Sequence, residues 1–404
     1  MIHSFSCKNF YSFKDLTTVS FVVNENAPKD NGYFVSSAEE RLSKVEVAIG
    51  PNASGKTNLL KVLPFLKWLI VDSFRLNPSA PIMIKPFLFK DHKERPIELS
   101  VEFEIDGKTY IYNFKLNEKR ILSEELKVKS KTRKKTTSKK IFSREWVEAD
   151  KKYKFIDEKF NSPKGLEDLL RTNSSVIESA IRLNHKESQD IAKFWQQIET
   201  NVVEAGWVGD SLGVPNQGIQ LIETLNFFSE NETLKKAAEN LLSRFDLGLE
   251  AINIEKKKVE NGFAFNVQVV HSFNGQKQLL PIQYESSGTR QLFVLLKSIL
   301  QVLNYGGIAV LDELDVNLHP EMVSSLLDLF INPETNPNNS QILFSTHSHQ
   351  ILNRLDKYQI VLIEKNKEGV SESWRLDETT GVRADDNYFM KYIAGAYGAV
   401  PKVS

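Results

Sequence analysis

The sequence predicts a mixed α/β fold, because apolar runs typical of buried strands alternate with segments of helical character. The apolar runs occupy residues 45–49, 308–311 and 341–346. Nearly continuous apolar runs of this length are typical of parallel strands covered on both faces. The chain of 404 residues has room for two or three domains, or for one large domain with an insertion.

The composition is that of an ordinary globular protein, with 41% hydrophobic and 26% charged residues and a formal net charge of +0. The single cysteine, Cys7, excludes an intramolecular disulfide and fits a reducing compartment. The N-terminus lacks a signal-peptide pattern, and the most apolar stretches are too short to span a bilayer. We therefore expect a cytoplasmic protein and not a membrane protein.

Residues 50–57 read GPNASGKT and match the phosphate-loop pattern G-x-x-x-x-G-K-[ST] at every fixed position. In that pattern the backbone N–H groups of a wide turn surround a phosphate, and the next helix presents its positive end to the anion. Lys56 is expected to reach the β- and γ-phosphates, and the Thr57 hydroxyl to bind Mg²⁺. A chance Gly/Ser-rich turn is the weaker interpretation, because a strand before the motif and a helix after it are both recognisable. We expect a nucleoside triphosphate to contact Gly50, Pro51, Asn52, Ala53, Ser54, Gly55, Lys56, Thr57 and Asn58.

The rest of the N-terminal third is predicted as strands and one helix. Residues 1–49 read as strands with turns, and residues 57–74 as a helix that Pro64 kinks. Segment 8–14 (KNFYSFK) has two open interpretations: it places aromatic and basic groups near an adenine base, or it packs two phenylalanines into the core. An alternating run interrupted by Asp-Gly further on is a strong hairpin signal. The strands of this hairpin are expected at residues 97–105 and 108–116.

Residues 127–140 read KVKSKTRKKTTSKK, with eight basic residues and no acidic one. Such a cluster attracts the phosphate backbone of nucleic acids, and the hydroxyl groups between the lysines can hydrogen-bond to it. The alternative is a solvated hairpin tip balanced by nearby acids such as Glu145, Glu148 and Asp150. The lack of interleaved aromatic residues and the zero net charge favour this alternative.

The middle of the chain is predicted to be an α-rich inserted lobe. The NSP sequence at 161–163 is a helix-start pattern, with a capping residue followed by proline, and helical periodicity continues to about residue 203. A glycine-rich loop is expected over residues 206–218 and a second helix over 233–245. Strands are expected to resume at residues 249–258 and 264–272.

Two acids, Asp312 and Glu313, end the second apolar run. In a phosphate-loop enzyme the first acid holds the Mg²⁺ shell, and the second polarises the attacking water. Upstream, a Ser–Gly turn at 285–291 leads into an apolar helix and is an anion site of its own. Downstream, the third apolar run ends at His347. Each feature alone has an ordinary explanation, such as a helix cap or a histidine at the core edge, but their occurrence together in this order does not.

This order of motifs resembles the ATP-binding-cassette (ABC) heads of the structural-maintenance-of-chromosomes (SMC) and RecF type, in which two heads sandwich two ATP molecules. The resemblance implies that Lys56 and Thr57 form the Walker A pair. Asp312 and Glu313 then form the Walker B pair, with Mg²⁺ held by Thr57 and Asp312. His347 looks like the switch histidine that contacts the γ-phosphate, and Glu313 would orient the attacking water.

The resemblance also assigns a signature turn. Ser286, Ser287 and Gly288 would reach the γ-phosphate of ATP on the partner subunit, and Asp315 falls in the D-loop. The sequence departs from the pattern in two places. The signature reads ESSGT instead of LSGGQ, and no glutamine follows the phosphate loop before Gln189, so the Q-loop residue cannot be identified.

A closer resemblance covers nearly the whole chain. The segments KNFYSFKD, KPFLF, LDELDVNLHPEM and STHSHQIL, and the closing residues 382–401, are similar to the AAA-labelled, ABC-like ATPases of bacterial abortive-infection and other anti-phage systems. Members of that group typically act with a separate nuclease subunit of the Toprim or RloB-like kind. They are related to the ATPase half of the overcoming-lysogenization-defect nucleases. The resemblance implies an ATPase that senses a phage-encoded trigger and controls a toxic partner.

We therefore expect an ABC-type P-loop ATPase head with an α-rich insertion, which binds ATP and Mg²⁺ and pairs as a homodimer or a higher homo-oligomer. Its parts would be residues 1–122 with Walker A, an insertion lobe at 123–248, and residues 249–404 with the signature, Walker B, the D-loop and the switch histidine. Two other functions compete with this one. A RecF-like clamp would bind DNA under ATP control, and an ATP-assembled scaffold would hardly hydrolyse ATP.

The nuclease is expected on another polypeptide, because only about sixty residues follow His347 and no Toprim-like acidic cluster is found there. Glu364, Asp385 and Asp386 could be proposed as metal ligands, but exposed acids in turns are the better explanation. The aromatic tail around residues 388–401 has two open roles: it docks the effector, or it closes the head domain.

Overall fold

The computed structural model describes residues 1–29, 32–37, 40–132, 135–202, 217–245, 248–260 and 262–401. Its centre is a six-stranded sheet with the strand order β11-β15-β16-β5-β17-β18. Neighbouring strands are parallel except for the antiparallel pair β17–β18. All residues of β5, β15 and β16 are buried, which confirms the prediction of buried parallel strands. The bounds are β5 Val45–Ile49, β11 Ile198–Thr200, β15 Ile308–Leu311, β16 Gln341–Ser345, β17 Ile360–Lys365 and β18 Ser371–Arg375.

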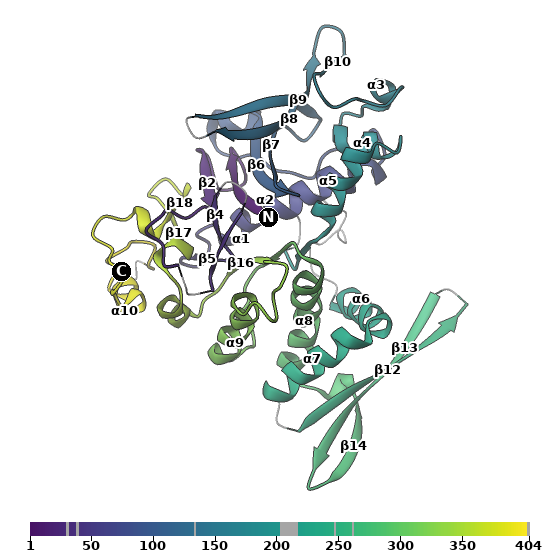
Figure 1. Ribbon diagram of the computed structural model, residues 1–404, viewed down its shortest axis with the longest axis vertical. Helices are drawn as coiled ribbons and strands as arrows, with labels where there is room; N and C mark the ends of the chain where they lie inside the picture. The colour runs from purple at the N-terminus through teal and green to yellow at the C-terminus, as the bar shows by residue number, and fades with distance from the viewer. Residues whose placement is uncertain are drawn as a thin grey trace.

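A second, antiparallel sheet of seven strands has the order β10-β9-β8-β7-β6-β1-β2 (Figure 1). Alternate residues of β6 are buried, so one face of this sheet lies against the core and the other is partly open to solvent. The predicted Asp-Gly hairpin is confirmed, because β6 and β7 have the expected bounds. The bounds are β1 Ile2–Lys8, β2 Thr17–Ser20, β6 Ile97–Ile105, β7 Lys108–Leu116, β8 Ile121–Thr132, β9 Lys135–Val147 and β10 Lys152–Asp157.

The helix that follows the phosphate loop lies between the two sheets. It has two parts, α1 (Lys56–Leu60) and α2 (Val62–Val71), followed by the 3-10 turn η1 (Ser73–Arg75). The helix is interrupted at Lys61, three residues before Pro64, whose missing N–H leaves the carbonyl of Leu60 without its helical donor. Nine of the ten α2 residues are buried, as expected for a helix covered by β1 on one side and β11 on the other.

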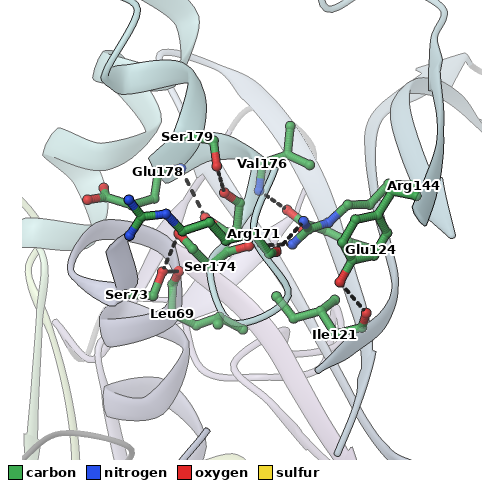
Figure 2. Close-up of polar contacts among 12 residues, drawn as sticks. Leu69, Ser73, Ile121, Glu124, Arg144, Arg171, Ser174, Val176, Glu178 and Ser179 are labelled. Carbon is green, nitrogen blue, oxygen red and sulfur yellow. Dashed lines mark hydrogen bonds and ion pairs between the residues drawn. The ribbon is translucent and has the colours of Figure 1, made fainter. Parts of the chain in front are cut away.

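A buried ion pair joins the antiparallel sheet to the helices beside it (Figure 2). The Arg144 guanidinium on β9 lies 2.6 Å from the Glu124 carboxylate on β8, and neither side chain is exposed. Glu124 also accepts a hydrogen bond from the backbone N–H of Val176, at 2.8 Å, where α4 (Val176–Ile181) begins. Arg144 donates to the carbonyl of Ser174 at 2.5 Å. The pair therefore fixes the position of α4 on the sheet.

A lobe of two helices and three strands projects from one end of the molecule (Figure 1). It packs on the long helix α8, where Phe228 of the lobe stacks on Phe293 with ring centroids 5.0 Å apart. The predicted helix at 233–245 and the strands at 249–258 and 264–272 are confirmed. Helix α6 was not predicted, and residues 203–216, which hold most of the expected glycine-rich loop, lie outside the described residues. The bounds are α6 Gln217–Glu230, α7 Glu232–Phe245, β12 Leu249–Val259, β13 Gly262–Phe273, β14 Gln276–Pro281 and α8 Ser287–Tyr305.

Two expectations for the middle of the chain are wrong. Helix α3 (Leu166–Leu169) begins after Gly165, so the NSP pattern at 161–163 does not start a helix. Helical structure ends with α5 (Lys186–Gln196), and residues 198–200 form β11 because this strand pairs in parallel with β15 at the edge of the core sheet. Tertiary pairing overrides local periodicity here.

The antiparallel sheet runs across residue 122, since β8 pairs with β7 on one side and with β9 on the other. Residues 123–248 therefore contribute strands to both sheets as well as the two helices of the lobe. The division of the chain at residues 122 and 248 stays a prediction. The remaining elements are β3 Phe34–Ser36, β4 Arg41–Ser43, η2 Lys90–Glu94, η3 Ile282–Tyr284, α9 Pro320–Ile331, η4 His349–Arg354, η5 Lys357–Gln359, η6 Leu376–Glu378 and α10 Tyr388–Ile393.

The aromatic tail packs on the head. Tyr388, Tyr392 and Tyr397 are buried in the core cluster that contains β5, and the N–H of Ala399 donates to the Glu364 carboxylate at 2.9 Å. These contacts favour the interpretation that the tail closes the head domain. Within the described ranges, no group of three or more His, Cys, Asp or Glu side chains is arranged to hold a metal ion. In the same ranges, no helix is long and apolar enough to cross a membrane.

Candidate nucleotide-binding site

The phosphate loop leaves the carboxyl end of β5 and is held tightly by the strands beside it. A Cβ atom on Gly50 would lie 2.0 Å from the carbonyl oxygen of Ile363 on β17, and one on Gly55 would lie 2.5 Å from the Ser371 hydroxyl on β18. Gly55 also has φ of 117°, a conformation that side chains disfavour. Both glycines of the motif are therefore required by the backbone path.

The ammonium group of Lys56 lies across the loop. Its Nζ donates to the carbonyls of Gly50 at 2.8 Å and Pro51 at 3.0 Å. Burial lowers the pKa of Lys56, and the nearby acids Asp312 and Glu313 act in the opposite direction. The loop thus holds a cation among its own carbonyls, at the mouth of the turn where the pattern places phosphate.

The first acid of the second apolar run meets the end of the phosphate loop. The Thr57 hydroxyl donates to Asp312 Oδ2 at 2.6 Å, although the two residues are 255 positions apart. Ser345, the last residue of β16, donates from its hydroxyl to Asp312 Oδ1 at 2.5 Å. Hydroxyl and carboxylate oxygens of this kind are the ligands that Mg²⁺ prefers.

The second acid has an unusual backbone. Glu313 has φ of 50°, in the left-handed region that residues other than glycine rarely adopt, and its N–H donates to the Ser345 hydroxyl at 2.8 Å. Its side chain is 54% exposed, and its carboxylate lies 3.7 Å from Nε2 of His347. The backbone N–H of His347 donates to both carboxylate oxygens of Asp315, at 3.0 and 3.1 Å. Asp315 therefore sets the position of the histidine.

The signature turn begins α8 and rests on the D-loop. The Ser286 hydroxyl caps the helix by accepting from the N–H of Thr289 at 3.0 Å. A Cβ on Gly288 would lie 2.8 Å from the carbonyl oxygen of Asn317, so the turn and the D-loop touch through their backbones. Ser286 and Ser287 are exposed at the start of the helix.

The family model described as "AAA domain, putative AbiEii toxin, Type IV TA system" matches residues 48–353, which include every motif above. The chain belongs to this family. The mixed α/β fold predicted from the sequence is confirmed by the parallel core sheet, and membership of an AAA-domain family confirms the predicted ATPase class.

One curated relative of this AAA-domain chain is the "Retron Vc95 probable ATPase" of Vibrio cholerae serotype O1 biovar El Tor. It is 27% identical over 158 residues, which are 36% of this chain and 29% of the relative. The match thus spans less than a third of that relative's length. Among solved structures, an SMC head domain from Thermotoga maritima covers 93% of this chain and 98% of its own, at 15% identity and TM-score 0.42. An SMC head from Pyrococcus furiosus, bound to the C-terminal domain of ScpA, covers 93% and 97% at 13% identity and TM-score 0.49.

Asn201 is a site residue that the sequence did not reveal in this AAA-domain chain. It follows β11, and its side-chain amide donates to the carbonyl of Asp312 at 2.9 Å and accepts from the N–H of Asp312 at 2.7 Å. The edge strand thus delivers an amide to the first acid, in a chain whose Q-loop glutamine could not be identified. The sequence did not reveal Ser345 either. Both residues reach the acids only through strand pairing, which leaves no local pattern in the sequence.

Segment 8–14 had two interpretations, packing of its phenylalanines into the core or a place beside the nucleotide, and different residues of the segment fit each one. Phe10 and Phe13 are fully buried, which favours the core-packing interpretation for the phenylalanines. The residues between them lie beside the phosphate loop. The Asn58 amide and the Ser371 hydroxyl both donate to the Ser12 hydroxyl, at 2.9 and 2.8 Å. Lys61 lies over the ring of Tyr11, 4.7 Å from its centroid.

The basic run lies on the β8–β9 hairpin, and three of its described lysines have acidic partners. Lys127 and Lys140 lie 2.5 and 3.4 Å from the carboxylate of Glu125. Lys129 lies 2.5 Å from the Glu102 carboxylate on β6. The side chains of residues 131–136 lie outside the description. For these three lysines, the ion pairs favour the solvated hairpin over a nucleic-acid contact, although the acids involved are not those named from the sequence.

Proposed function

We propose that this chain binds ATP with Mg²⁺ at residues 50–58 and hydrolyses it as a dimer of two heads. The observation that carries the proposal is the 2.6 Å contact between the Thr57 hydroxyl and the Asp312 carboxylate. It brings the phosphate loop and the acids together although 255 positions of the chain separate them. A chance glycine-rich turn would have no reason to meet such an acid.

The residues present fit ATP and a divalent cation. The two glycines allow the loop backbone to approach a phosphate closely, and Lys56 supplies a positive charge at the loop mouth. Thr57 and Asp312 would hold Mg²⁺, which neutralises phosphate charge when bound. Lys56 is already positioned by loop carbonyls, so it needs only to exchange these partners for phosphate oxygens.

Glu313 and His347 are placed to act on the attacking water. The exposed Glu313 carboxylate accepts a hydrogen bond from water and orients it toward the γ-phosphate. The Ser345 hydroxyl accepts from the left-handed backbone of Glu313, and the Glu313 carboxylate lies 3.7 Å from Nε2 of His347. His347, held by Asp315, donates to the γ-phosphate oxygens as negative charge shifts during the reaction.

The partner head completes the site. Ser286, Ser287 and Gly288 lie at the N-terminal end of a 19-residue helix, whose positive end favours an anion. Since Ser286 and Ser287 are exposed, a second head can present them to the γ-phosphate of the first. ATP then joins two heads, and its hydrolysis separates them.

We further propose that this cycle serves bacterial anti-phage defence. The family description names an abortive-infection toxin, and the curated relative is named as a retron ATPase. The effector is a separate subunit, such as a nuclease of the Toprim or RloB-like kind. Glu364 accepts a hydrogen bond from the tail and Asp386 is paired with Lys391 at 2.5 Å, and these contacts support a structural role for both acids. A phage-encoded component would trigger release of the effector.

Light scattering on the purified protein tests the core of this proposal. The mass of the wild type, Glu313→Gln and Lys56→Ala is measured without nucleotide and with ATP and Mg²⁺. We expect Glu313→Gln to bind ATP without hydrolysing it and to double in mass, while Lys56→Ala stays unchanged. A mass that ATP does not alter in any variant would refute ATP-driven pairing of heads.

A further inference from the structure

One side-chain hydrogen bond connects the projecting lobe directly to the signature turn. Nε2 of His271, on the middle strand of the lobe sheet, lies 2.7 Å from Oε1 of Glu285. Glu285 is the residue immediately before Ser286, which caps α8. The His271 side chain is one quarter exposed, and the Glu285 side chain is almost fully buried.

Glu285 is held from two directions. Its backbone N–H donates to the carbonyl of Ile282 at 3.1 Å, and its carboxylate accepts from the imidazole of His271. A nearly buried carboxylate that loses its partner is costly, because desolvation is then uncompensated. Without the histidine, Glu285 would turn toward water and carry the signature turn with it.

The opposite side of the turn is held by the D-loop. Gly288 touches the carbonyl of Asn317, and the Asn317 amide donates to the Gln291 side chain at 2.8 Å. The signature turn therefore lies between two supports. One belongs to the chain's own acidic site, and the other belongs to the lobe.

We propose that His271 is a positioning residue for ATP hydrolysis, which acts through Glu285 on the signature turn presented to the partner's ATP. This inference rests on the proposed pairing of heads. It also assigns a task to the lobe. Because the lobe sheet carries His271, a ligand that shifts the sheet against α8 alters the site of the neighbouring subunit and leaves the phosphate loop of its own chain intact.

Complementation in trans between two impaired full-length variants tests the inference. Lys56→Ala lacks a working phosphate loop but keeps its signature turn. His271→Ala keeps its phosphate loop and loses the support of its turn. We expect His271→Ala alone to hydrolyse ATP about tenfold more slowly, as the loss of one hydrogen bond to a charged group predicts. Mixing the two variants should restore turnover, because a mixed dimer pairs the intact loop of one chain with the intact turn of the other.

Three controls make the outcome decisive. The double variant Lys56→Ala, His271→Ala mixed with His271→Ala has no intact turn opposite a working loop and should not recover. Glu285→Ala should show the same loss and the same rescue, and it replaces His271→Ala if that variant does not fold. Lys277→Ala removes an exposed ion pair of the same sheet, 2.7 Å from Glu250, and should keep wild-type turnover.

A loss that Lys56→Ala cannot rescue would mean that His271 only stabilises the fold, and full activity of His271→Ala would mean that it does nothing. Either result overturns the inference while the pairing of heads stands. If Glu313→Gln gains no mass with ATP, pairing itself fails and the inference fails with it.

Discussion

Ser345 supports both acids of the candidate site through one hydroxyl. It donates to the Asp312 carboxylate and accepts from the N–H of Glu313, so it sets the angle between the proposed metal-binding acid and the proposed water-orienting acid. Groups that orient metal ligands commonly matter almost as much as the ligands do. The same reasoning applies to Asn201, whose side-chain amide hydrogen-bonds to both the N–H and the carbonyl of Asp312.

We predict that Ser345→Ala lowers ATP turnover by about 10–100-fold, the range typical for loss of a group that orients a metal ligand. The Mg²⁺ concentration needed for half-maximal activity should rise, because Asp312 is freer to rotate. Steady-state phosphate release over a Mg²⁺ titration measures both effects. Ser340→Ala is the matched control, since this buried serine donates to the carbonyl of Val302 at the other end of the same strand segment. Equal losses in the two variants would contradict the prediction.

Residues of the site differ in how far the sequence reveals them. The phosphate loop is predictable because its residues are consecutive and the spacing of Gly50, Gly55 and Lys56 is specific to one type of turn. Ser345 and Asn201 have no such pattern. Each residue reaches the acids only because its strand pairs with β15. The partner strand is more than thirty residues away in the sequence for β16 and more than one hundred residues away for β11.

At the level of elements, the buried pair Arg144–Glu124 is the strongest polar link between the antiparallel sheet and the helices. We predict that Arg144→Ala lowers the free energy of unfolding by about 3–5 kcal/mol, because the carboxylate of Glu124 is left buried without its positive partner. Urea denaturation measures the change. Lys115→Ala, which removes an exposed pair with Glu98 at 3.8 Å, should cost less than about 1 kcal/mol. Similar costs for the two changes would mean that the buried pair is not the link described.

A second buried acid, Glu178, lies on helix α4 and makes the stability of the fold depend on pH. Burial raises the pKa of Glu178 to about 7, against the opposing effect of Arg182. The folded state then holds a proton that the unfolded chain releases near its ordinary pKa, so this group's contribution to stability falls as pH rises from about 4.5 to 7. We predict that Glu178→Gln removes this fall. Thermal unfolding at about pH 5 and about pH 8 should show the variant gaining stability over wild type at the higher pH. An advantage that does not change with pH would contradict the assignment.

Elements were predictable where one signal dominated. The Asp-Gly hairpin of β6 and β7 and the buried strands β5, β15 and β16 follow from local pattern alone. The strand β11 did not, because three residues at a sheet edge carry no period of their own and the helical pattern before them runs on. Helix α6 was not predicted, because a glycine-rich segment of the sequence leads into it.

For the whole molecule, the C-terminal tail acts as part of the head's core. We predict that deleting residues 388–404 lowers the melting temperature, because three tyrosines leave the core cluster and Trp374 loses its cover. Calorimetry measures this change. A tail that only docks an effector would leave the melting temperature unchanged.

The central strand β5 has both of its neighbours, β16 and β17, about three hundred positions further along the chain. A ribosome adds residues at about 5–20 per second, so the nascent β5 waits on the order of 15–60 s before either edge is covered. Ser371, whose hydroxyl donates to the carbonyl of Ser54 in the phosphate loop, is synthesised later still. A growing or prematurely stopped chain thus carries the phosphate-loop motif without its support. The contacts that support the phosphate loop are therefore complete only after β16, β17 and Ser371 have been added to the chain.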